Sequence, residues 1–379
     1  MKNILIINTN TNNDYWLEYF DYLKIKNCQL FFLSSDKKLL ASLKKRGYWH
    51  KKIFCLFKNK LSFFKKIIFC LLRPLDFLKS FVILSYFKLS KKIDTLILFA
   101  NSEKISYSRA AKLLALKVYW INSPDAELSN TGFCPKNLSK LSRLAQVIVM
   151  LDKQKSKLLE QGYDETNISK INIGIKKNKL AEQKNIFQSI AQNTTQGNYK
   201  KFYTVGTIQE LSGDVSHIEK LLHSTKNCLD VIPHIQLIIA GEGPERKRLS
   251  WMANKMEINN LVWFVGNHRH PQKWLSNFDV FISTTPKPNI KDISILLMAM
   301  CNGLCVIAPN NAGLNEIIEN NHSGLLADIP EGDDLTSKII NSQQNFQKRK
   351  KLGENAKLFA NENFRLQDSL EKFYATLEK

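Results

Sequence analysis

Short apolar runs alternate along the chain with longer stretches in which apolar residues recur every three or four positions. Runs of the first kind predict buried β-strands, and stretches of the second kind predict amphipathic helices. Because the two kinds alternate, the pattern indicates a parallel sheet that is covered on both faces. In the first half the predicted strands are Asn3–Asn8, Gln29–Leu33, Thr95–Ala100, Val118–Asn122 and Val147–Met150, and the predicted helices are Asp14–Lys26, Ser106–Leu116 and Lys153–Gln161.

The alternation starts again after a polar stretch, residues 179–200, whose Asn, Gln and Lys content is typical of a linker. This linker separates an N-terminal domain, residues 1–178, from a C-terminal domain, residues 201–350. A long helical pattern over residues 351–379 is expected to return to the N-terminal domain. The sequence therefore predicts an α/β protein with two Rossmann-like, doubly wound parallel-sheet domains that face a cleft.

The second domain has its own set of predicted elements. Its strands are Phe202–Val205, Ile235–Ala240, Leu261–Val265, Val280–Ser283 and Cys305–Ala308, and its helices are Ser216–Val231, Pro244–Met256, Ile293–Cys301 and Asp334–Gln344.

The composition, 44% hydrophobic and 23% charged over 379 residues, excludes a disordered, collagenous or small disulfide-rich chain. The first apolar stretch is too short for a signal peptide, and no window approaches the roughly 18 uninterrupted apolar residues of a membrane span. The seven cysteines form no C-x-x-C pair, which favours a reducing compartment and argues against structural zinc. We expect a cytoplasmic protein with no metal and no cofactor.

The net charge of +21 is confined to one half of the chain. Residues 1–200 hold 35 Lys and Arg against 14 Asp and Glu, whereas residues 201–379 hold 20 of each. One domain is therefore expected to meet an anionic partner, and the other is not.

Much of this charge lies in the segment Lys51–Lys92, with 11 Lys and Arg, one acid and many aromatic residues. In a helix, Lys65, Lys66 and Arg73 fall on one side, with apolar residues that include Phe63 and Phe64 on the rest. This composition is typical of a helix that lies on an anionic membrane surface, here the inner face of the membrane. A core helix with a solvated lysine face is the alternative. Nucleic acid is not favoured, because the aromatic residues sit in aliphatic runs rather than on a polar, base-stacking surface.

Five segments of the second half carry a family resemblance. In order and spacing they resemble the C-terminal domain of family-4 retaining glycosyltransferases of the GT-B fold. A weaker resemblance extends through Val147–Ile175. The segments are TVGTIQELSG (Thr204–Gly213), LIIAGEGPERKRL (Leu237–Leu249), NNLVWFVGN (Asn259–Asn267), FDVFISTT (Phe278–Thr285) and LLMAMCNGLCVIAPNNAGLNEIIENNHSGLL (Leu296–Leu326).

The resemblance implies that a nucleotide-diphosphate sugar binds mostly to the C-terminal domain and reacts with retention at its anomeric carbon. It also implies that no metal is bound. Basic side chains and a helix N-terminus would then stabilise the charge of the departing diphosphate. The basic N-terminal domain would hold the acceptor.

The sequence departs from the family pattern at most of the charged positions of this donor site. The family's Arg and Lys correspond to Thr207 and Ser212, and its Glu-x7-Glu pair falls at Ile290 and Met298. In the N-terminal domain, a turn that often reads His-Gly-x-Asp reads Asn122–Asp125 here, so that the His is absent and Asp125 remains. The resemblance therefore implies a degenerate donor site.

Other residues could replace the missing groups. Lys287 and Lys291 lie in the loop before the predicted helix Ile293–Cys301, whose first turn would offer free N–H groups near Ser294 and Ile295. Arg246, His268 and Arg269 lie on loops that could also face the cleft, and a solvated loop charge is the favoured alternative for each of these cations and for the two lysines. Asp292 and Asp125 are the candidate catalytic carboxylates. The candidate donor-binding residues are Gly206, Thr207, Gly241, Glu242, Gly243, Gly266, Asn267, Lys287, Lys291, Ser294, Ile295 and Met298.

Two functions remain open from the sequence. The first is a membrane-peripheral glycosyltransferase that moves a sugar from a nucleotide-activated donor to a lipid-linked or cell-surface glycan acceptor. The second is a non-catalytic subunit of the same fold that binds a partner transferase, a glycan or the membrane. The missing charges favour the second function, and the family resemblance favours the first.

Overall fold

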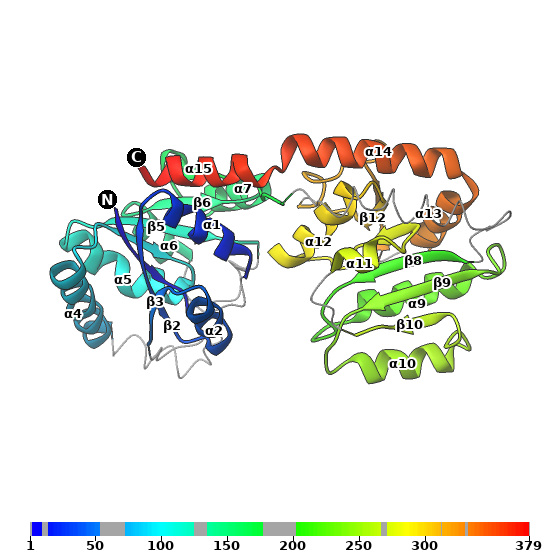
Figure 1. Cartoon of the computed structure of the whole chain (residues 1–379), viewed down its shortest axis with the longest axis horizontal. Coiled ribbons are helices and arrows are strands. Elements are labelled where there is room, and N and C mark those ends of the chain that lie inside the picture. The colour runs from blue at the N-terminus through cyan, green and yellow to red at the C-terminus, as the bar shows by residue number, and fades with distance from the viewer. Residues whose placement is uncertain are drawn as a thin grey trace. The chain divides into compact units, whose positions relative to one another are not determined.

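The computed structural model divides the chain into two compact units, which Figure 1 shows together. The first unit combines Met1–Asn172 with Ser369–Lys379, and the second is Ile173–Asp368. The structure describes residues 2–9, 14–53, 73–124, 135–176, 202–266, 271–311, 313–329 and 333–378.

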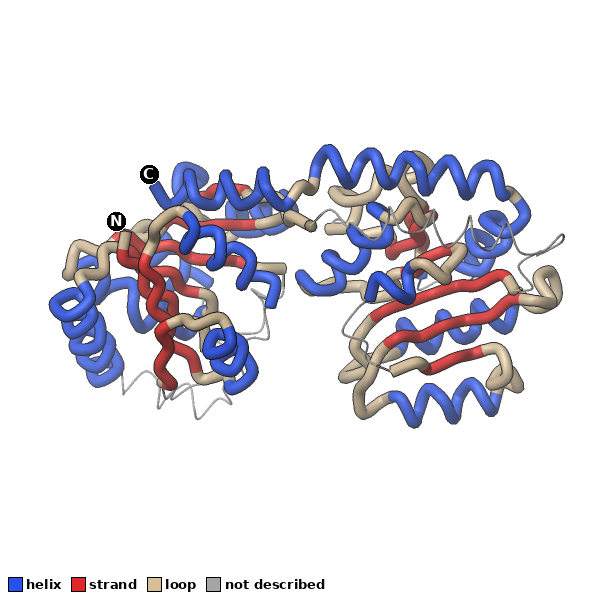
Figure 2. The backbone as a smooth tube through the Cα atoms, in the orientation of Figure 1, coloured by secondary structure: helices blue, strands red, loops and turns tan. Residues whose placement is uncertain are grey.

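The first unit is built on a seven-stranded parallel sheet with the strand order β3-β2-β1-β4-β5-β6-β7 (Figures 1 and 2). The order reverses between β1 and β4, which makes this pair the topological switch point of the sheet. The strands are β1 Asn3–Ile7, β2 Gln29–Ser34, β3 Trp49–Lys52, β4 Thr95–Leu98, β5 Lys117–Asn122, β6 Gln146–Val149 and β7 Ile168–Lys170. The helices include α1 Asp14–Ile25, α2 Lys37–Lys45, α4 Arg73–Lys91, α5 Asn101–Leu113, α6 Pro135–Ser142 and α7 Asp152–Glu160.

The second unit is built on a six-stranded parallel sheet with the order β10-β9-β8-β11-β12-β13. Its switch point lies between β8 and β11. The strands are β8 Tyr203–Ile208, β9 Ile235–Ala240, β10 Val262–Phe264, β11 Val280–Ile282, β12 Cys305–Pro309 and β13 Leu325–Ala327. The helices are α9 Ser216–Asn227, α10 Arg246–Lys255, α11 Pro271–Leu275, α12 Ile290–Cys301, α13 Asp333–Gln344 and α14 Phe346–Asn363.

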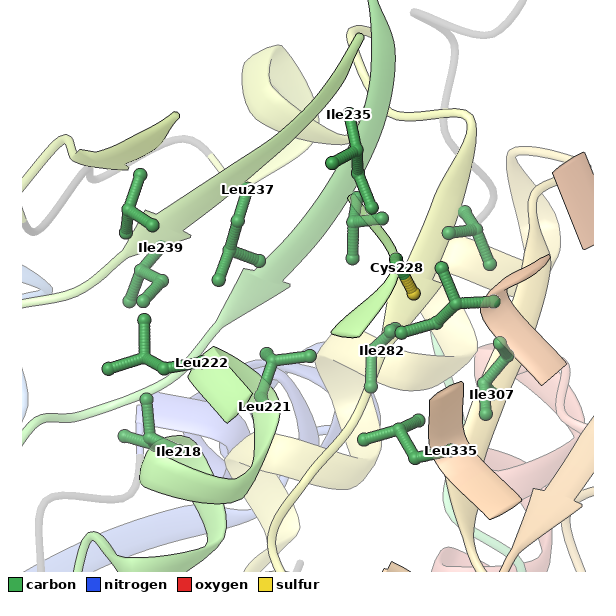
Figure 3. Close-up of a cluster of buried hydrophobic side chains, with 14 of the residues drawn as sticks. Ile218, Leu221, Leu222, Cys228, Ile235, Leu237, Ile239, Ile282, Ile307 and Leu335 are labelled. Carbon is green, nitrogen blue, oxygen red and sulfur yellow. The ribbon is translucent and has the colours of Figure 1, made fainter. Parts of the chain in front are cut away.

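The core of the second unit forms where α9 covers the sheet. Figure 3 shows Ile218 and Leu222 of α9 on the same side as Leu237 and Ile239 of β9, and all four side chains are fully buried. Aliphatic side chains that alternate along each strand face this layer, because successive residues of a strand point to opposite faces. The apolar core therefore holds the strands in register and leaves the polar residues to the strand ends.

The predicted fold class, an α/β protein with two Rossmann-like parallel-sheet domains, is confirmed. The sequence pattern did not predict β3, β7 and β13, which are short strands of three or four residues. Two helices also begin earlier than predicted: α5 begins at Asn101 rather than Ser106, and α12 begins at Ile290 rather than Ile293.

The C-terminal tail is two helices and not the single helical stretch that the sequence pattern predicted. α14 ends at Asn363, and α15 runs over Leu366–Glu378. Between them the buried Phe364 accepts a hydrogen bond from the Ile175 amide at 2.9 Å, and the Leu366 amide donates to the Ile175 carbonyl at 3.1 Å. These strand-like bonds replace the intrahelical bonds and end the first helix.

The end of α15 belongs to the first unit. Lys2 Nζ donates to the Leu377 carbonyl at 2.7 Å, and the ring of Phe373 packs edge-on against Tyr19 with 5.3 Å between the centroids. Side chains of α15 and of α1 thus pack together in the core of the first unit.

Candidate active site

A buried polar cluster lies at the switch point of the second unit. Gln209 directly follows β8, and Thr284 and Thr285 lie two and three residues after the end of β11. The side-chain oxygen of Gln209 accepts hydrogen bonds from both threonine hydroxyls at 3.1 Å. Ligands of open α/β sheets bind outside the carboxyl ends of the strands at such a point, so this cluster lies where a ligand is expected.

Two hydrogen-bond donors of this region are buried without a partner among the described residues. They are Gln209 Nε2 and the hydroxyl of Thr207, whose side chains are 7% and 1% exposed. The two residues are two positions apart and therefore leave the backbone on the same face of the sheet. A buried donor without a partner costs about 1–3 kcal/mol, so an oxygen-rich ligand that met both would be stabilised.

Gly241 and Gly243 are required by the packing of two neighbouring loops. A Cβ atom at Gly241 would lie 1.9 Å from the carbonyl oxygen of Gln209, and one at Gly243 would lie 1.9 Å from that of Leu211. No flexible side chain could move aside, because both obstacles are backbone atoms. These glycines therefore hold the carboxyl ends of β8 and β9 together, and their role as donor-binding residues stays a prediction.

Gly206 has a similar packing role, since a Cβ atom there would lie 2.2 Å from the ring of Phe278. Gly266 follows β10 with a left-handed backbone, φ +75°, which favours glycine. Asn267, the next predicted donor-binding residue, lies outside the described residues.

Glu242 and Arg246 pair with each other at the start of α10. One guanidinium nitrogen of Arg246 binds the Glu242 carboxylate, and the other donates to the Phe264 carbonyl at 2.9 Å. Arg246 is thus held by groups of its own domain, which makes it a poor replacement for the family's missing cations.

The first N–H groups of α12 are capped by two nearby side chains. Asn289 precedes the helix, and its side-chain oxygen accepts from the amides of Lys291 at 2.8 Å and Asp292 at 3.0 Å. Asp292 in turn accepts from the Asn289 amide at 3.1 Å. This reciprocal arrangement is a capping box, in which the first turn binds itself. Asp292 therefore serves as a cap, and its catalytic role stays a prediction.

The prediction that Ser294 and Ile295 lie in the first turn of α12 is wrong. Asn289 starts the helix three residues earlier than the apolar pattern suggested, so the amides of both residues fall within the intrahelical ladder. The Ser294 hydroxyl points back along the helix and donates to the Ile290 carbonyl at 2.7 Å.

Both positions of the family's acid pair lie on α12 and are apolar. Ile290 is buried, and the sulfur of the half-buried Met298 lies 3.6 Å from the side-chain nitrogen of Gln272. Lys287 and Lys291 are exposed on either side of the cap. The two lysines are thus the cations nearest to the beginning of this helix in sequence.

The sheet of the first unit has a polar edge that the sequence analysis missed. Glu103, in the first turn of α5, is buried at the switch point between β1 and β4. Its carboxylate accepts from the amide and hydroxyl of Thr9 at 2.5 Å, from the Phe99 amide at 3.0 Å and from the Ala100 amide at 2.9 Å. Burial raises the pKa of Glu103, and the hydrogen bonds from Thr9, Ala100 and Phe99 oppose this rise.

Lys104, the next residue, is buried as well. Its ammonium donates to the Ile121 carbonyl at 3.1 Å and to the side-chain oxygens of Asn101 (3.4 Å) and Asn122. Burial lowers the pKa of Lys104 to about 7, and the charge of Glu103 partly opposes this change. A sequence signal existed: two charged residues directly after an apolar strand, in SEK (Ser102–Lys104), at the carboxyl edge of the sheet.

Several predicted site residues lie outside the described residues. They are the catalytic candidate Asp125 and the membrane candidates Phe63, Phe64, Lys65 and Lys66. Arg73 is the first residue of α4, and nothing is described of its side chain.

Over the ranges that the structure describes, no group of three or more His, Cys, Asp or Glu side chains could hold a metal ion. Across the same ranges, every helix is too short or too polar to cross a bilayer. The expected absence of a metal and of a cofactor stays a prediction.

Comparison with known proteins identifies the second unit. Residues 185–359 match the family Glycosyl transferases group 1. The second unit is therefore similar to a group 1 glycosyltransferase domain. The matched residues, called the group 1 domain below, contain the Gln209 cluster, the glycine loops and the whole of α12.

A curated relative supports the same assignment. An uncharacterized glycosyltransferase of Methanocaldococcus jannaschii is 27% identical over 254 residues, which cover 65% of this chain and 62% of the relative. The chain spans less than two thirds of the length of the curated relatives that it matches.

Solved structures show the fold of the whole chain. A glycosyltransferase from Rickettsia africae matches with a TM-score of 0.80 at 17% identity and covers 99% of this chain and 97% of that chain. HepE of Anabaena, in complex with UDP and glucose, matches with a TM-score of 0.72 at 18% identity and covers 99% of each chain. The predicted GT-B fold is therefore confirmed.

Proposed function

We propose that the chain is a glycosyltransferase that moves a sugar from a nucleotide-activated donor to a lipid-linked or cell-surface glycan acceptor, with retention at the anomeric carbon. The observation that carries this proposal is the pair of unpartnered donors, Thr207 and Gln209, at the switch point of the group 1 domain. The complex of HepE with UDP and glucose supports a uridine nucleotide as the donor.

The two donors offer a way to bind the diphosphate without the family's Arg and Lys. The Thr207 hydroxyl and the Gln209 amide would each meet a phosphate oxygen, as neutral N–H and O–H groups do in other anion sites. Lys287 and Lys291 would add positive charge at the start of α12. A hydrogen bond to a charged group contributes about 1.5–3 kcal/mol, so two such bonds can offset much of what the lost cations supplied.

The acceptor is proposed to be presented at an anionic lipid surface. α4 packs Leu84 and Phe87 into the core of the first unit, yet it also exposes a second apolar face. The side chains of that face are 57–82% exposed and follow one another at intervals of three or four residues; they are Leu75, Leu78, Val82, Tyr86 and Leu89.

Positive charge lies beside this apolar face. Half-buried Lys79 lies next to this face in helical spacing, and exposed Lys92 follows the end of α4. Lys88 and Lys91 point elsewhere, because Lys88 donates to the Leu114 carbonyl and Lys91 lies over the ring of Phe31. An exposed apolar stripe with lysines next to it suits the interface of an anionic membrane, where the leucines insert and the lysines contact lipid headgroups. The first half of the chain carries the whole net charge of +21, which adds attraction at longer range.

Nucleotide binding is the direct test of the proposed function. We would titrate UDP, GDP, ADP and dTDP into the purified protein by calorimetry and measure thermal unfolding in parallel. A nucleotide at 100 times its Kd should stabilise the protein by about 2.7 kcal/mol. Transfer of labelled sugar from the matching nucleotide sugar to a membrane extract then tests catalysis.

Gln209→Glu is the informative variant, because it replaces the unpartnered amide by a carboxylate that repels phosphate. We expect at least about tenfold weaker nucleotide binding. Gln236→Glu is the matched control, since Gln236 is the second residue of β9, at the amino end of the same sheet, and donates to the Thr204 hydroxyl at 2.7 Å. Equal nucleotide affinity in the two variants would argue against the proposed donor site.

The apolar residues at the family's acid positions favour a second candidate function, a non-catalytic subunit. Ile290 and Met298 cannot accept hydrogen bonds from ribose or sugar hydroxyls as carboxylates do. A protein that binds none of the four nucleotides but co-purifies with an active glycosyltransferase would support this candidate and exclude the first.

A further inference from the structure

The solvent side of α2 carries positive charge with no acid among it. Residues 37–52 contain seven Lys and Arg and no Asp or Glu. The apolar side of this helix is occupied, because Leu39 and Leu43 are buried in the first unit. Asp36, just before the helix, is used as its N-cap. The solvent side is left to four exposed lysines, which are Lys37, Lys38, Lys44 and Lys45.

The spacing of these lysines arranges them in two rows. Side chains seven positions apart in an α-helix lie nearly one above the other, about 10 Å apart along the axis. Lys37 and Lys44 therefore form one row, and Lys38 and Lys45 form the other. Ala41 is exposed between them, and its single methyl group does not fill the space that separates the rows. These four side chains are called the lysine rows below.

The charge of the lysine rows is not compensated within the described part of the chain. No described Asp or Glu forms an ion pair with any of the four ammonium groups, and Arg46, which follows the helix, binds Asp21 instead. Lys52 extends the positive charge onto the edge strand β3, where it pairs in register with Ser34, three residues before α2 begins. An anionic chain along this surface would relieve the repulsion between these charges.

We infer that the lysine rows bind an anionic glycan, so that the acceptor of the proposed sugar transfer is a chain that carries carboxylate or phosphate groups. The inference rests on the proposed function, because sugar transfer to a glycan is what requires a glycan partner. Two parallel rows of about 10 Å suit a chain of several charged sugars rather than one small anion. The surface lies wholly in the first unit, so it is complete without the second.

The lysine rows suit a polymer better than the lipid surface proposed for α4. α2 and α4 lie on opposite faces of the first unit's sheet, as Figure 1 shows, so their solvent sides point in opposite directions. A flat lipid surface against α4 therefore does not meet the lysine rows. α2 also exposes no large apolar side chain that could insert into lipid.

Binding of defined polymers to the whole chain tests the inference. Calorimetry would compare polygalacturonate, which carries carboxylates, phosphomannan, which carries phosphates, and dextran, which is neutral. The wild type should bind at least one of the two anionic glycans, less tightly as salt rises from about 0.05 to 0.3 M, and should not bind dextran. The tighter of the two identifies the charged group of the acceptor. No binding to either anionic glycan would overturn the inference.

A variant with the four lysines changed to Gln removes the charge and keeps a residue that favours helix. It should bind the anionic glycan at least about tenfold more weakly, with nearly unchanged thermal unfolding. The matched control lowers the net charge equally in the second unit by changing four exposed lysines of α14 to Gln; they are Lys348, Lys350, Lys351 and Lys357. An equal loss in both variants would show attraction by overall charge alone and would overturn the inference.

Ala41→Glu tests whether the glycan lies between the two rows. A carboxylate there should repel the anionic chain and weaken binding at least about fivefold, although the net charge changes by only two lysines' worth less than in the control's four-lysine change. Leu358→Glu is the matched control, because it adds the same charge on α14, where Leu358 is 61% exposed. Equal glycan affinity in these two variants would contradict the placement and the inference with it.

Two other partners would give different results. Single-stranded RNA that binds more tightly than either glycan would overturn the inference in favour of nucleic acid. Sedimentation with anionic vesicles that the α2 variant loses completely would overturn it in favour of lipid.

Failure of this inference is distinguishable from failure of the proposed function. A wild-type protein that binds a nucleoside diphosphate but no anionic glycan overturns only the inference. A wild-type protein that binds an anionic glycan through the lysine rows but no nucleoside diphosphate contradicts the proposed function.

Discussion

Asn122, Thr207 and Gln209 share one property at the scale of the residue: each holds a buried hydrogen-bond donor without a partner among the described residues. All three lie in or next to the last residues of a central strand. Folding hides these groups from water, and none of the described residues compensates them, so a ligand that binds there gains free energy that an exposed site would not provide.

At the same scale, the buried Lys104 leads to a prediction of how the free energy of unfolding depends on pH. Burial lowers its pKa from 10.5 to about 7, so between these values the unfolded chain binds one more proton than the folded chain. The free energy of unfolding should therefore rise as the pH increases from about 7 to about 10.5. Lys104→Met should remove this part of the rise, which urea unfolding of both proteins across that pH range measures. Parallel pH profiles for the two proteins would contradict the prediction.

The beginnings of helices were the main errors of sequence reasoning at the scale of the element. Apolar periodicity placed the start of α5 at Ser106 and that of α12 at Ile293. The true starts are set by polar groups: Glu103 accepts from the backbone before α5, and Asn289 caps α12. Capping hydrogen bonds set where a helix begins or ends, but they leave no apolar periodicity in the sequence. The starts of α5 and α12, at the sheet edges, were therefore predicted at the wrong residues.

The start of α12 carries a prediction about nucleotide binding. Changing both Lys287 and Lys291 to Ala should weaken nucleoside diphosphate binding by about tenfold, because two cations next to a helix N-terminus stabilise phosphate. Thermal stability should hardly change, since both side chains are exposed. Asn289→Ala is the contrasting variant, which should lower the free energy of unfolding by about 1 kcal/mol through loss of the cap. An unchanged Kd in the double variant would remove the lysines from the donor site.

The exposed face of α4 carries a prediction about membranes. Replacing Leu78 and Leu89 by Gln should reduce sedimentation with vesicles that contain anionic lipid, because each side chain loses the free energy of insertion, about 1.5–3 kcal/mol at full burial. The control is Leu358→Gln, which alters a leucine of α14 that is 61% exposed. Binding by the wild type should fall as salt rises from about 0.1 to 0.5 M. Binding that is insensitive to lipid charge and to salt would count against the lipid surface.

At the scale of the whole molecule, the chain leaves the first unit and later returns to it. The chain leaves the first unit near Asn172, forms the second unit and returns at Ser369. Residues that are more than 350 positions apart therefore share one core, as Trp16 and Phe373 show. Side chains of α15 are part of this core, which couples the stability of the first unit to that helix.

The packing of α15 in the first unit leads to a prediction about the stability of that unit. Phe373→Ala should lower the free energy of unfolding of the first unit by about 3–5 kcal/mol, because the buried ring packs against Trp16 and Tyr19 of α1. Hydrogen exchange should show faster exchange in α1 and β1, with α9 of the second unit unchanged. The same experiment on Phe346→Ala, an exposed residue that begins α14, is the control. Loss of protection in α9 alone would refute this assignment of the terminal helix.

The sequence by itself determined the α/β class, the two parallel-sheet domains and the resemblance to the glycosyltransferases, because apolar periodicity and motif order are local properties of the chain. Only the tertiary structure decided which polar residues come together. Glu103 meets Thr9 and Gln209 meets Thr284 because strands that are far apart in the sequence become neighbours at a switch point. The partners of a buried polar group depend on this strand order, which no local pattern encodes.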